Sequence, residues 1–272
     1  MKYIWSFLVL ISSYYCQGQE IGFPVDASAN GFGYATTGRD NVFGLSGNAA
    51  ALADLQDITI SASVQNSFLI EDLFDYSISS VFPLKNAGLG IYLEHFDFEA
   101  YRQQVISVGY GLALYRQLSI GVRLRYLNFR IPEESATSSL SGGLFLKYRL
   151  NDQILFGMEL NPFRGKQISV NQRMTTYQKF GFSYQPSEII TVSGDLIYHS
   201  DLLTQISAAI GISYEIIDQL EVQLGYRSNP DFISIGASIG IWDGLNLYIS
   251  ASIHQQLGVT PVSGFGYQAI NK

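Results

Sequence analysis

The chain is short of charged residues and of cysteine, and both shortages limit what it can be. Only 14% of its 272 residues are charged, whereas a typical soluble domain has about 25%. The net charge is −7 and the Lys and Arg residues are scattered, which argues against a nucleic-acid-binding surface. Cys16 is the single cysteine. A chain processed after this residue would have no disulfide framework and no thiol chemistry.

Segments of helical periodicity and helical length are also missing after residue 57. Instead, apolar residues recur at every second position, as in LEVQLGYR, where Leu220, Val222, Leu224 and Tyr226 share one face. A period of two is the signature of a β-strand. We predict fourteen strands, at 57–68, 74–83, 86–97, 102–115, 117–130, 138–150, 153–162, 176–185, 188–199, 204–216, 219–228, 231–242, 244–255 and 261–271.

The connections between these strands are sorted by length. Those after even-numbered strands are short, such as LKNA, LND and WDG, and those after odd-numbered strands tend to be longer and polar, such as FRIPEESATSS. This sorting is typical of outer-membrane barrels, which have short periplasmic turns and long external loops. The sequence therefore predicts an all-β, transmembrane, antiparallel up-and-down β-barrel of about fourteen strands over 57–272. We expect it in the cell outer membrane of a Gram-negative bacterium, surrounded by lipid, with both mature termini periplasmic.

The two faces of the strands differ in composition, which supports a membrane location. One face carries Leu, Ile, Val and Phe, and tyrosines lie near its segment ends: Tyr110, Tyr126, Tyr148, Tyr184, Tyr198, Tyr214 and Tyr226. Aromatic residues at such positions form the girdles of transmembrane barrels. The opposite face is mainly Ser, Thr, Gly, Gln and Asn. A soluble barrel around a ligand would need only about eight strands.

The N-terminus has the pattern of an export signal. Lys2 precedes the apolar stretch YIWSFLVLISSYY, which has the length of a signal-peptide core and is too short for a membrane-spanning helix of about 20 residues. Cys16 and Gly18 are small residues just before Gln19, so we expect residues 1–18 to be a signal peptide. Acylation of Cys16 is the alternative, which the two bulky tyrosines before it disfavour.

Patterns that suggest catalysis or metal binding have simpler interpretations. GASIG at 236–240 fits the G-x-S-x-G motif, but that motif requires a strand–turn–helix, and Ser238 lies inside an alternating strand. Nothing pairs His95, His199 or His254 with a particular serine, and no residues have the spacing of zinc ligands. We therefore predict a non-enzymatic protein without a catalytic site, a metal or a cofactor.

Charged residues on the polar faces are candidates for a lumen network: Glu94, Arg123, Arg125, Lys147, Arg149 and Glu159. One interpretation is a selectivity ring for small anions. The other is a set of salt bridges that brace the wall and a plug, which is favoured because buried charges must be paired. Glycines on the same faces either allow a plug to approach closely or ease strand bending: Gly90, Gly109, Gly121, Gly236 and Gly240.

Residues 19–56 precede the barrel and contain the stretch LSGNAAALADLQD at 45–57, which predicts a short helix. This opening resembles the start of the FadL-like outer-membrane barrels, particularly their PorV/PorQ relatives of the type IX secretion system. Members of that group show Asn-Pro-Ala-(Ala/Gly)-Leu-Ala before the first strand. The corresponding residues are Asn48, Ala49, Ala50, Ala51, Leu52 and Ala53, with Ala49 in place of the proline. The resemblance implies that 19–56 forms a hatch inside a fourteen-stranded barrel, whose lumen side chains alone would not fill.

The resemblance implies two functions. The first is an accessory or shuttle subunit for protein secretion or cell-surface assembly, with other outer-membrane or secretion-system proteins as partners. The alternative is a FadL-like transporter of a small hydrophobic compound across the outer membrane. The chain is shorter than typical transporters, and its longest loop, 161–178, is basic and polar, so the sequence favours the first. A hatch would obstruct a third possibility, a general diffusion porin.

Overall fold

The computed structural model describes residues 23–40, 45–99, 101–130, 137–163, 176–200 and 205–269. Its strands are β1 Thr59–Asn66, β2 Phe74–Leu84, β3 Ala87–Phe98, β4 Tyr101–Tyr115, β5 Leu118–Arg130, β6 Thr137–Arg149, β7 Ile154–Phe163, β8 Tyr177–Ser187, β9 Ile190–His199, β10 Ile206–Ile217, β11 Leu220–Arg227, β12 Phe232–Trp242, β13 Leu245–His254 and β14 Gly258–Gln268. The expected signal peptide, with Cys16, lies outside these residues, as do residues 164–175 of the long loop.

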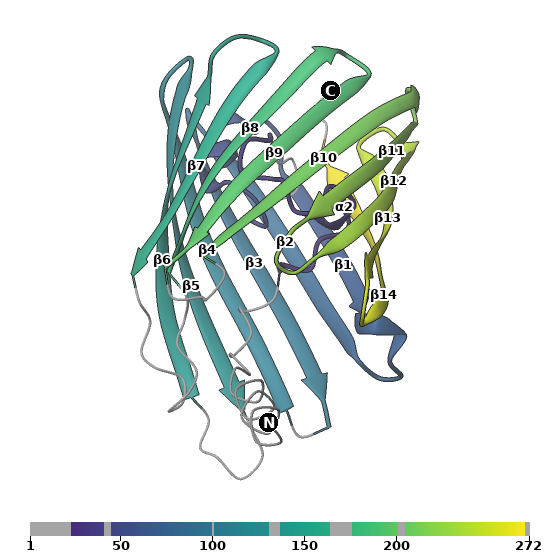
Figure 1. Ribbon diagram of the computed structural model, residues 1–272. Coiled ribbons are helices and arrows are strands. Elements are labelled where there is room, and N and C mark those ends of the chain that lie inside the picture. Colours follow the sequence, from purple (N-terminus) through teal and green to yellow (C-terminus); the bar gives the residue numbers. More distant parts are fainter. Residues whose placement is uncertain are drawn as a thin grey trace, which may run out of the picture.

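The fourteen strands form one closed antiparallel barrel, in which each strand pairs with its neighbours in sequence (Figure 1). The last strand closes onto the first, with Thr59 opposite Gln268 and Gln65 opposite Val262. The start of β1 and the end of β14 therefore lie at the same end of the barrel, together with the short turns that follow the even-numbered strands. We call this end the short-turn end and the opposite one the loop end. The predicted all-β up-and-down barrel of fourteen strands is confirmed.

The largest boundary difference falls in the last strand, which begins at Gly258 rather than at residue 261. Pro261 suggests a loop because proline cannot donate a backbone hydrogen bond. In the structure Pro261 lies opposite Ala251 of β13, whereas the pairing of β14 with β1 extends only to Val262. The strand thus has one neighbour at Pro261, and such edge-like positions tolerate proline.

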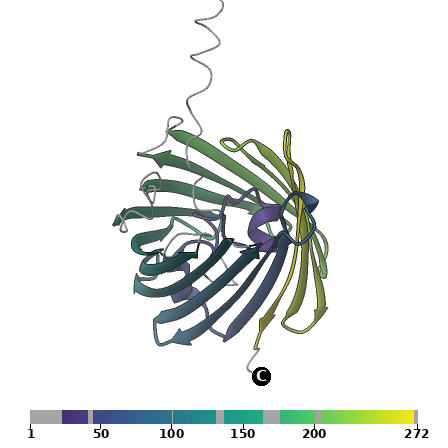
Figure 2. The ribbon, with the colours of Figure 1, turned by 90° about the horizontal axis from the view of Figure 1, so that it is seen from below.

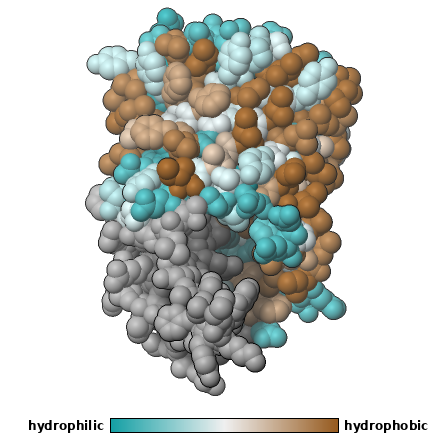
Figure 3. Space-filling model, in the orientation of Figure 1, coloured by the Kyte–Doolittle hydropathy of each residue, from teal (hydrophilic) through white to brown (hydrophobic). Residues whose placement is uncertain are grey.

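Apolar side chains point out of the barrel and small polar side chains point in. On β12, Ile233 and Ile235 are 56% and 49% exposed, whereas Ser234 between them is fully buried. The seven tyrosines named above are all exposed, with Tyr126, Tyr198 and Tyr226 toward the loop end and the others toward the short-turn end. Brown, apolar side chains cover much of the visible wall (Figure 3). No helix within the described residues is long and apolar enough to span a bilayer.

Two short helices lie inside the barrel (Figure 2). They are the α-helix α2, Ala27–Gly31, and the 3-10 helix η1, Ala49–Asp54; a third short element, η2, Ser67–Leu69, follows β1. The helix expected in 45–57 is present as η1, whereas α2 has no counterpart in the sequence analysis. We call residues 23–40 and 45–56 the lumen segment.

Candidate functional site in the barrel lumen

The lumen segment contacts different sectors of the wall with its two helices. Its first helix, α2, packs against β11–β14 and β1, and its second, η1, packs against β2–β6. The two helices are seen on different sides of the lumen when the barrel is viewed along its axis (Figure 2). We treat the lumen segment and the wall that it touches as the candidate functional site.

Asp26 begins α2 and joins the two halves of the lumen segment. Its Oδ1 accepts hydrogen bonds from the backbone N–H groups of Ser28 and Ala29, at 2.9 and 3.1 Å, as expected of an N-cap residue. Its Oδ2 accepts a hydrogen bond from the hydroxyl of Ser46. Asp26 therefore fixes the start of the helix and holds residue 46 beside it.

Serines of the wall satisfy carbonyl groups of α2. The hydroxyl of Ser250 donates to the carbonyl of Ala27 at 2.7 Å, and that of Ser234 donates to the carbonyl of Gly31 at 3.2 Å. A helix of five residues leaves most of its carbonyls without an internal partner. These bonds replace the missing ones, so α2 depends on the barrel for its stability.

Asn48 begins η1 and attaches it to the wall. Its Oδ1 accepts a hydrogen bond from the N–H of Ala50 at 2.9 Å. Its Nδ2 donates to the carbonyls of Thr37, in the other half of the lumen segment, and Leu146, on β6, at 2.9 and 3.0 Å. The six residues of the predicted motif are all buried. Their role as a hatch stays a prediction, and these contacts favour it.

Glycines on β3, β4 and β5 allow close contact with the lumen segment. A Cβ added to Gly121 would lie 2.5 Å from the backbone nitrogen of Ala50, and one added to Gly109 would lie 2.2 Å from Leu45 Cδ2. Gly90 and Gly236 also face the lumen segment, whereas a Cβ on Gly240 would meet no atom nearer than 3.4 Å. Close approach therefore accounts for four of the five glycines noted in the sequence.

Lys147 and Arg149 of β6 pair with carboxylates of the lumen segment. Lys147 Nζ contacts both Asp40 and Asp54, and Arg149 Nη2 lies 2.6 Å from Asp40 Oδ2 and 3.5 Å from Asp54 Oδ2. Although burial raises the pKa of Asp40, the two cations outweigh it and hold that pKa below its usual 3.8. The wall and both halves of the lumen segment thus meet in one ionic cluster.

Arg123 of β5 forms a second link between the wall and the lumen segment. Its Nη2 pairs with Glu159 of β7, and its Nη1 donates to the carbonyl of Leu45 at 2.8 Å. Glu159 also accepts a hydrogen bond from the hydroxyl of Tyr177 at 2.8 Å. The side chains of Arg123 and Glu159 are 13% and 5% exposed, so this pair is shielded from solvent.

Glu94 and Arg125 belong to neither of these clusters. The Glu94 carboxylate accepts hydrogen bonds from the hydroxyl of Tyr92 and the N–H of Val25, at 2.5 and 3.5 Å. Arg125 forms no ion pair with a described residue, and its buried Nε has no hydrogen-bond partner there. The six predicted charges are therefore divided among separate contacts, four of them in ion pairs. This favours the bracing role over an anion ring, and the role itself stays a prediction.

Asp40, Asp54 and Asp195 were missed as site residues. Asp195 Oδ2 accepts hydrogen bonds from the N–H groups of Thr36 and Thr37, both at 3.1 Å, and from Thr37 Oγ1 at 2.7 Å. The sequence indicates only weakly that they belong to the site: Asp195 faces inward in an alternating strand, and Asp54 lies at the end of the alanine-rich stretch. Nothing in the sequence indicates which residues they contact.

The three histidines lie on three different strands, β3, β9 and β13. His199 is buried beside the hydroxyl of Ser207, His95 lies 4.0 Å from Asp97, and His254 Nδ1 accepts hydrogen bonds from its own turn. Across the described ranges, no group of three or more His, Cys, Asp or Glu residues could hold a metal ion.

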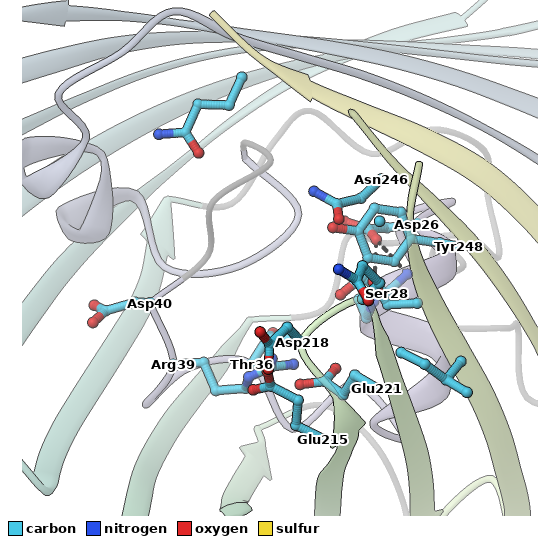
Figure 4. A pocket seen from close by; sticks show the side chains of 16 residues that line it. Asp26, Ser28, Thr36, Arg39, Asp40, Glu215, Asp218, Glu221, Asn246 and Tyr248 are labelled. Carbon is cyan, nitrogen blue, oxygen red and sulfur yellow. Dashed lines mark hydrogen bonds between the residues drawn. The ribbon is translucent and has the colours of Figure 1, made fainter. Parts of the chain in front are cut away.

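A polar cavity of about 330 Å³ lies between α2 and the short-turn end of β10–β14 (Figure 4). Its lining is Asp26, Ser28, Ala29, Thr36, Arg39, Asp40, Glu215, Asp218, Gln219, Leu220, Glu221, Ser238, Gly240, Asn246, Tyr248 and Gln268. A second cavity of about 170 Å³ shares Arg39 and Asp40 with it. Both are lined mainly by polar side chains, and no pattern in the sequence indicates either of them.

No protein family model matches the chain, and no curated protein matches its sequence. Solved structures do match its fold. The chain is similar to the CymD monoaromatic hydrocarbon channel, with a TM-score of 0.71, 13% identity, and coverage of 93% of this chain and 100% of that one. It is also similar to the Pseudomonas putida toluene transporter TodX, with a TM-score of 0.68, 12% identity, and coverage of 93% and 98%.

A Pseudomonas aeruginosa FadL homologue is a third similar structure, with a TM-score of 0.56, 10% identity, and coverage of 90% of this chain and 93% of that one. At these identities the likeness concerns the fold alone. The chain therefore has the fold of the FadL-like channels, a closed fourteen-stranded barrel. The expected FadL-like architecture agrees with this finding, and nothing in it singles out the PorV/PorQ branch.

Proposed function

We propose that this protein is an outer-membrane channel that carries a small hydrophobic compound across the outer membrane of a Gram-negative bacterium. The observation that carries the proposal is the match in fold, over 93% of the chain, to a monoaromatic hydrocarbon channel and to a toluene transporter. The outward apolar surface, with tyrosines toward both ends of the strands, supports a place in the membrane. The sequence favours a secretion accessory, whereas the similarity in fold supports the transporter.

The orientation follows from the loop lengths. In outer-membrane barrels the short turns face the periplasm and the longer loops face the outside. We therefore place the short-turn end, with the start of β1 and the end of β14, on the periplasmic side. The lumen segment fills the β3–β6 side, so we propose that a compound passes where this segment is displaced.

Uptake of radiolabelled toluene tests the proposal. Cells that produce the chain should accumulate toluene severalfold faster than cells with an empty vector, while swelling of proteoliposomes in arabinose stays at the level of protein-free liposomes. Equal toluene uptake with and without the chain would contradict the proposal. A steady open conductance in planar bilayers would instead indicate a diffusion porin.

A PorV/PorQ-like accessory role is the second candidate, and one observation favours it. The two cavities described above are polar, and neither offers an apolar chamber. A hydrophobic ligand would have no preformed site there. Crosslinking and affinity purification from solubilised outer membranes test this role: a stoichiometric secretion-system or surface protein, together with unchanged toluene uptake on deletion of the chain, would favour it over transport.

A further inference from the structure

Arg39 places a positive charge in the 330 Å³ cavity without a carboxylate partner. Its guanidinium carbon lies 3.5 Å from the centre of the Phe32 ring, a cation–π contact that orients the group. Within the part of the chain that the structure describes, Arg39 forms no ion pair and its side chain forms no hydrogen bond. A guanidinium has five N–H donors in a planar fork that matches a carboxylate. These donors are free for a ligand.

The β10–β11 hairpin contributes three carboxylates to the same cavity. Figure 4 shows Glu215, Asp218 and Glu221 on the side of the cavity where Arg39 lies. The side chains of Glu215 and Asp218 form no hydrogen bond or ion pair with a described residue, and Glu221 uses only Oε1, which accepts from Gln223. These three carboxylates are therefore available to a ligand.

The other two acidic residues of the lining, Asp26 and Asp40, already have partners within the protein. Asp26 caps α2 with one oxygen and binds Ser46 with the other. Asp40 pairs with Lys147 and Arg149. The available charges of the cavity are therefore one guanidinium and three carboxylates, and the opposite side carries Ser28, Asn246 and Tyr248 together with the carboxylate of Asp26 (Figure 4).

We propose that this cavity binds a small zwitterion, whose carboxylate contacts Arg39 and whose ammonium group contacts the carboxylates of the β10–β11 hairpin. A ligand with only a positive charge would leave Arg39 unpaired, and one with only a negative charge would meet the hairpin carboxylates. A volume of about 330 Å³ lies at the small end of ligand pockets, which limits the ligand to roughly the size of an amino acid. The site is separate from the proposed hydrocarbon transport and does not depend on it.

Three compounds that share one side chain test this charge requirement. L-Phenylalanine carries both charges, L-phenylalaninamide only the ammonium, and N-acetyl-L-phenylalanine only the carboxylate. Isothermal titration calorimetry on the purified full chain in detergent should show L-phenylalanine binding at least tenfold more tightly than either derivative. Equal affinity for all three compounds, tighter binding of the amide, or no binding at 10 mM would overturn the proposal.

Substitutions on each side of the cavity separate the two contacts. R39Q should reduce the affinity for L-phenylalanine to that for the amide, without weakening binding of the amide. The triple variant E215Q/D218N/E221Q should reduce the affinity for L-phenylalanine to the affinity for the N-acetyl compound. Exposed residues in turns at the same end of the barrel supply the matched controls R116Q and D243N, which should bind as the wild type does.

Heat-modified electrophoretic mobility identifies any variant whose barrel has not formed. If the barrel of R39Q does not form, R39K replaces it as a milder change that removes the planar fork. Wild-type affinity in R39Q or R39K would overturn the proposal. Toluene uptake is measured separately. A chain that binds the zwitterion but does not carry toluene would support this site and contradict only the proposed transport function.

Discussion

The two sides of the lumen are filled in different ways. On the side of β3–β6, η1 packs through small and apolar side chains. They form a buried cluster with residues of the wall: Leu45, Ala49, Ala50, Leu52, Val81, Tyr92 and Phe145. Wall glycines bring the backbones into contact there, and ionic clusters surround the packed region.

On the side of β10–β14, hydrogen bonds from wall serines add to the packing of α2. Ser234 and Ser250 bond its carbonyls, and Asn30 Nδ2 donates to Ser250 Oγ at 3.1 Å. The cavity lies beside these contacts. The two sides therefore differ in what adds to packing: ionic clusters hold the lumen segment on the β3–β6 side, whereas hydrogen bonds from wall serines hold α2 on the β10–β14 side and a cavity remains beside it.

Filling a contact glycine should have the largest effect on this arrangement. In G121A the new Cβ would meet the backbone of Ala49 and Ala50 at 2.7 and 2.5 Å, and backbone atoms cannot move aside as a flexible side chain can. Overpacking of this kind costs about 1–3 kcal/mol. We expect faster tryptic cleavage after Arg39 of the lumen segment.

G240A is the matched control, because its Cβ would meet Asn246 only at 3.4 Å, an ordinary contact. Its cleavage rate should equal that of the wild type. Equal protection in G121A and G240A would show that η1 is not tightly packed against β5.

Removing the central cation of the ionic cluster should have the next largest effect. Lys147 is 2% exposed and contacts Asp40 and Asp54, which are 47% and 37% exposed. Loss of a fully buried partner costs about 3–5 kcal/mol, but these half-exposed carboxylates remain solvated and keep Arg149. We therefore expect K147M to lower the free energy of unfolding by about 1–2 kcal/mol, measured by urea titration. K85M, in an exposed turn, should leave it unchanged.

Two asparagines allow a direct comparison of the two sides. Asn48 caps η1 and bonds Leu146, so N48A should cost about 1 kcal/mol of unfolding free energy. Asn246 lines the cavity, and N246A should change that free energy by less than about 0.5 kcal/mol. Similar losses in the two variants would mean that both sides are anchored alike.

The barrel could be predicted because it depends on patterns that are local in the sequence. Alternation along each strand reports which face points out of the barrel, as Ile233 and Ser234 show, and hairpin connections join strands that are neighbours in sequence. The stretch 45–57 could also be placed before the wall, because its small residues and Asn48 are typical of a capped short helix.

The site could be predicted only in part, because its contacts are between distant segments. Lys147 was identified as a lumen charge, but its partners Asp40 and Asp54 lie about a hundred residues earlier, on a segment whose path is set by packing. The helix α2 has five residues, too few to show a helical period. The cavity arises where α2 leaves β10–β14 unfilled, which no local pattern records.

Acidification should give the smallest effect and should weaken the ionic cluster only at low pH. The pKa of Asp40 in the folded protein is held below its usual 3.8 by Lys147 and Arg149, which outweigh its burial. Its contribution to stability is therefore complete above the usual pKa and is lost as the pH falls through the lower folded value. Because Asp40 is 47% exposed, solvent weakens this contribution. Pepsin cleavage of the lumen segment should increase below about pH 4 in the wild type, and less so in D40N, which has already lost the charge. Identical pH profiles for the two proteins would show that Asp40 does not hold the lumen segment against β6.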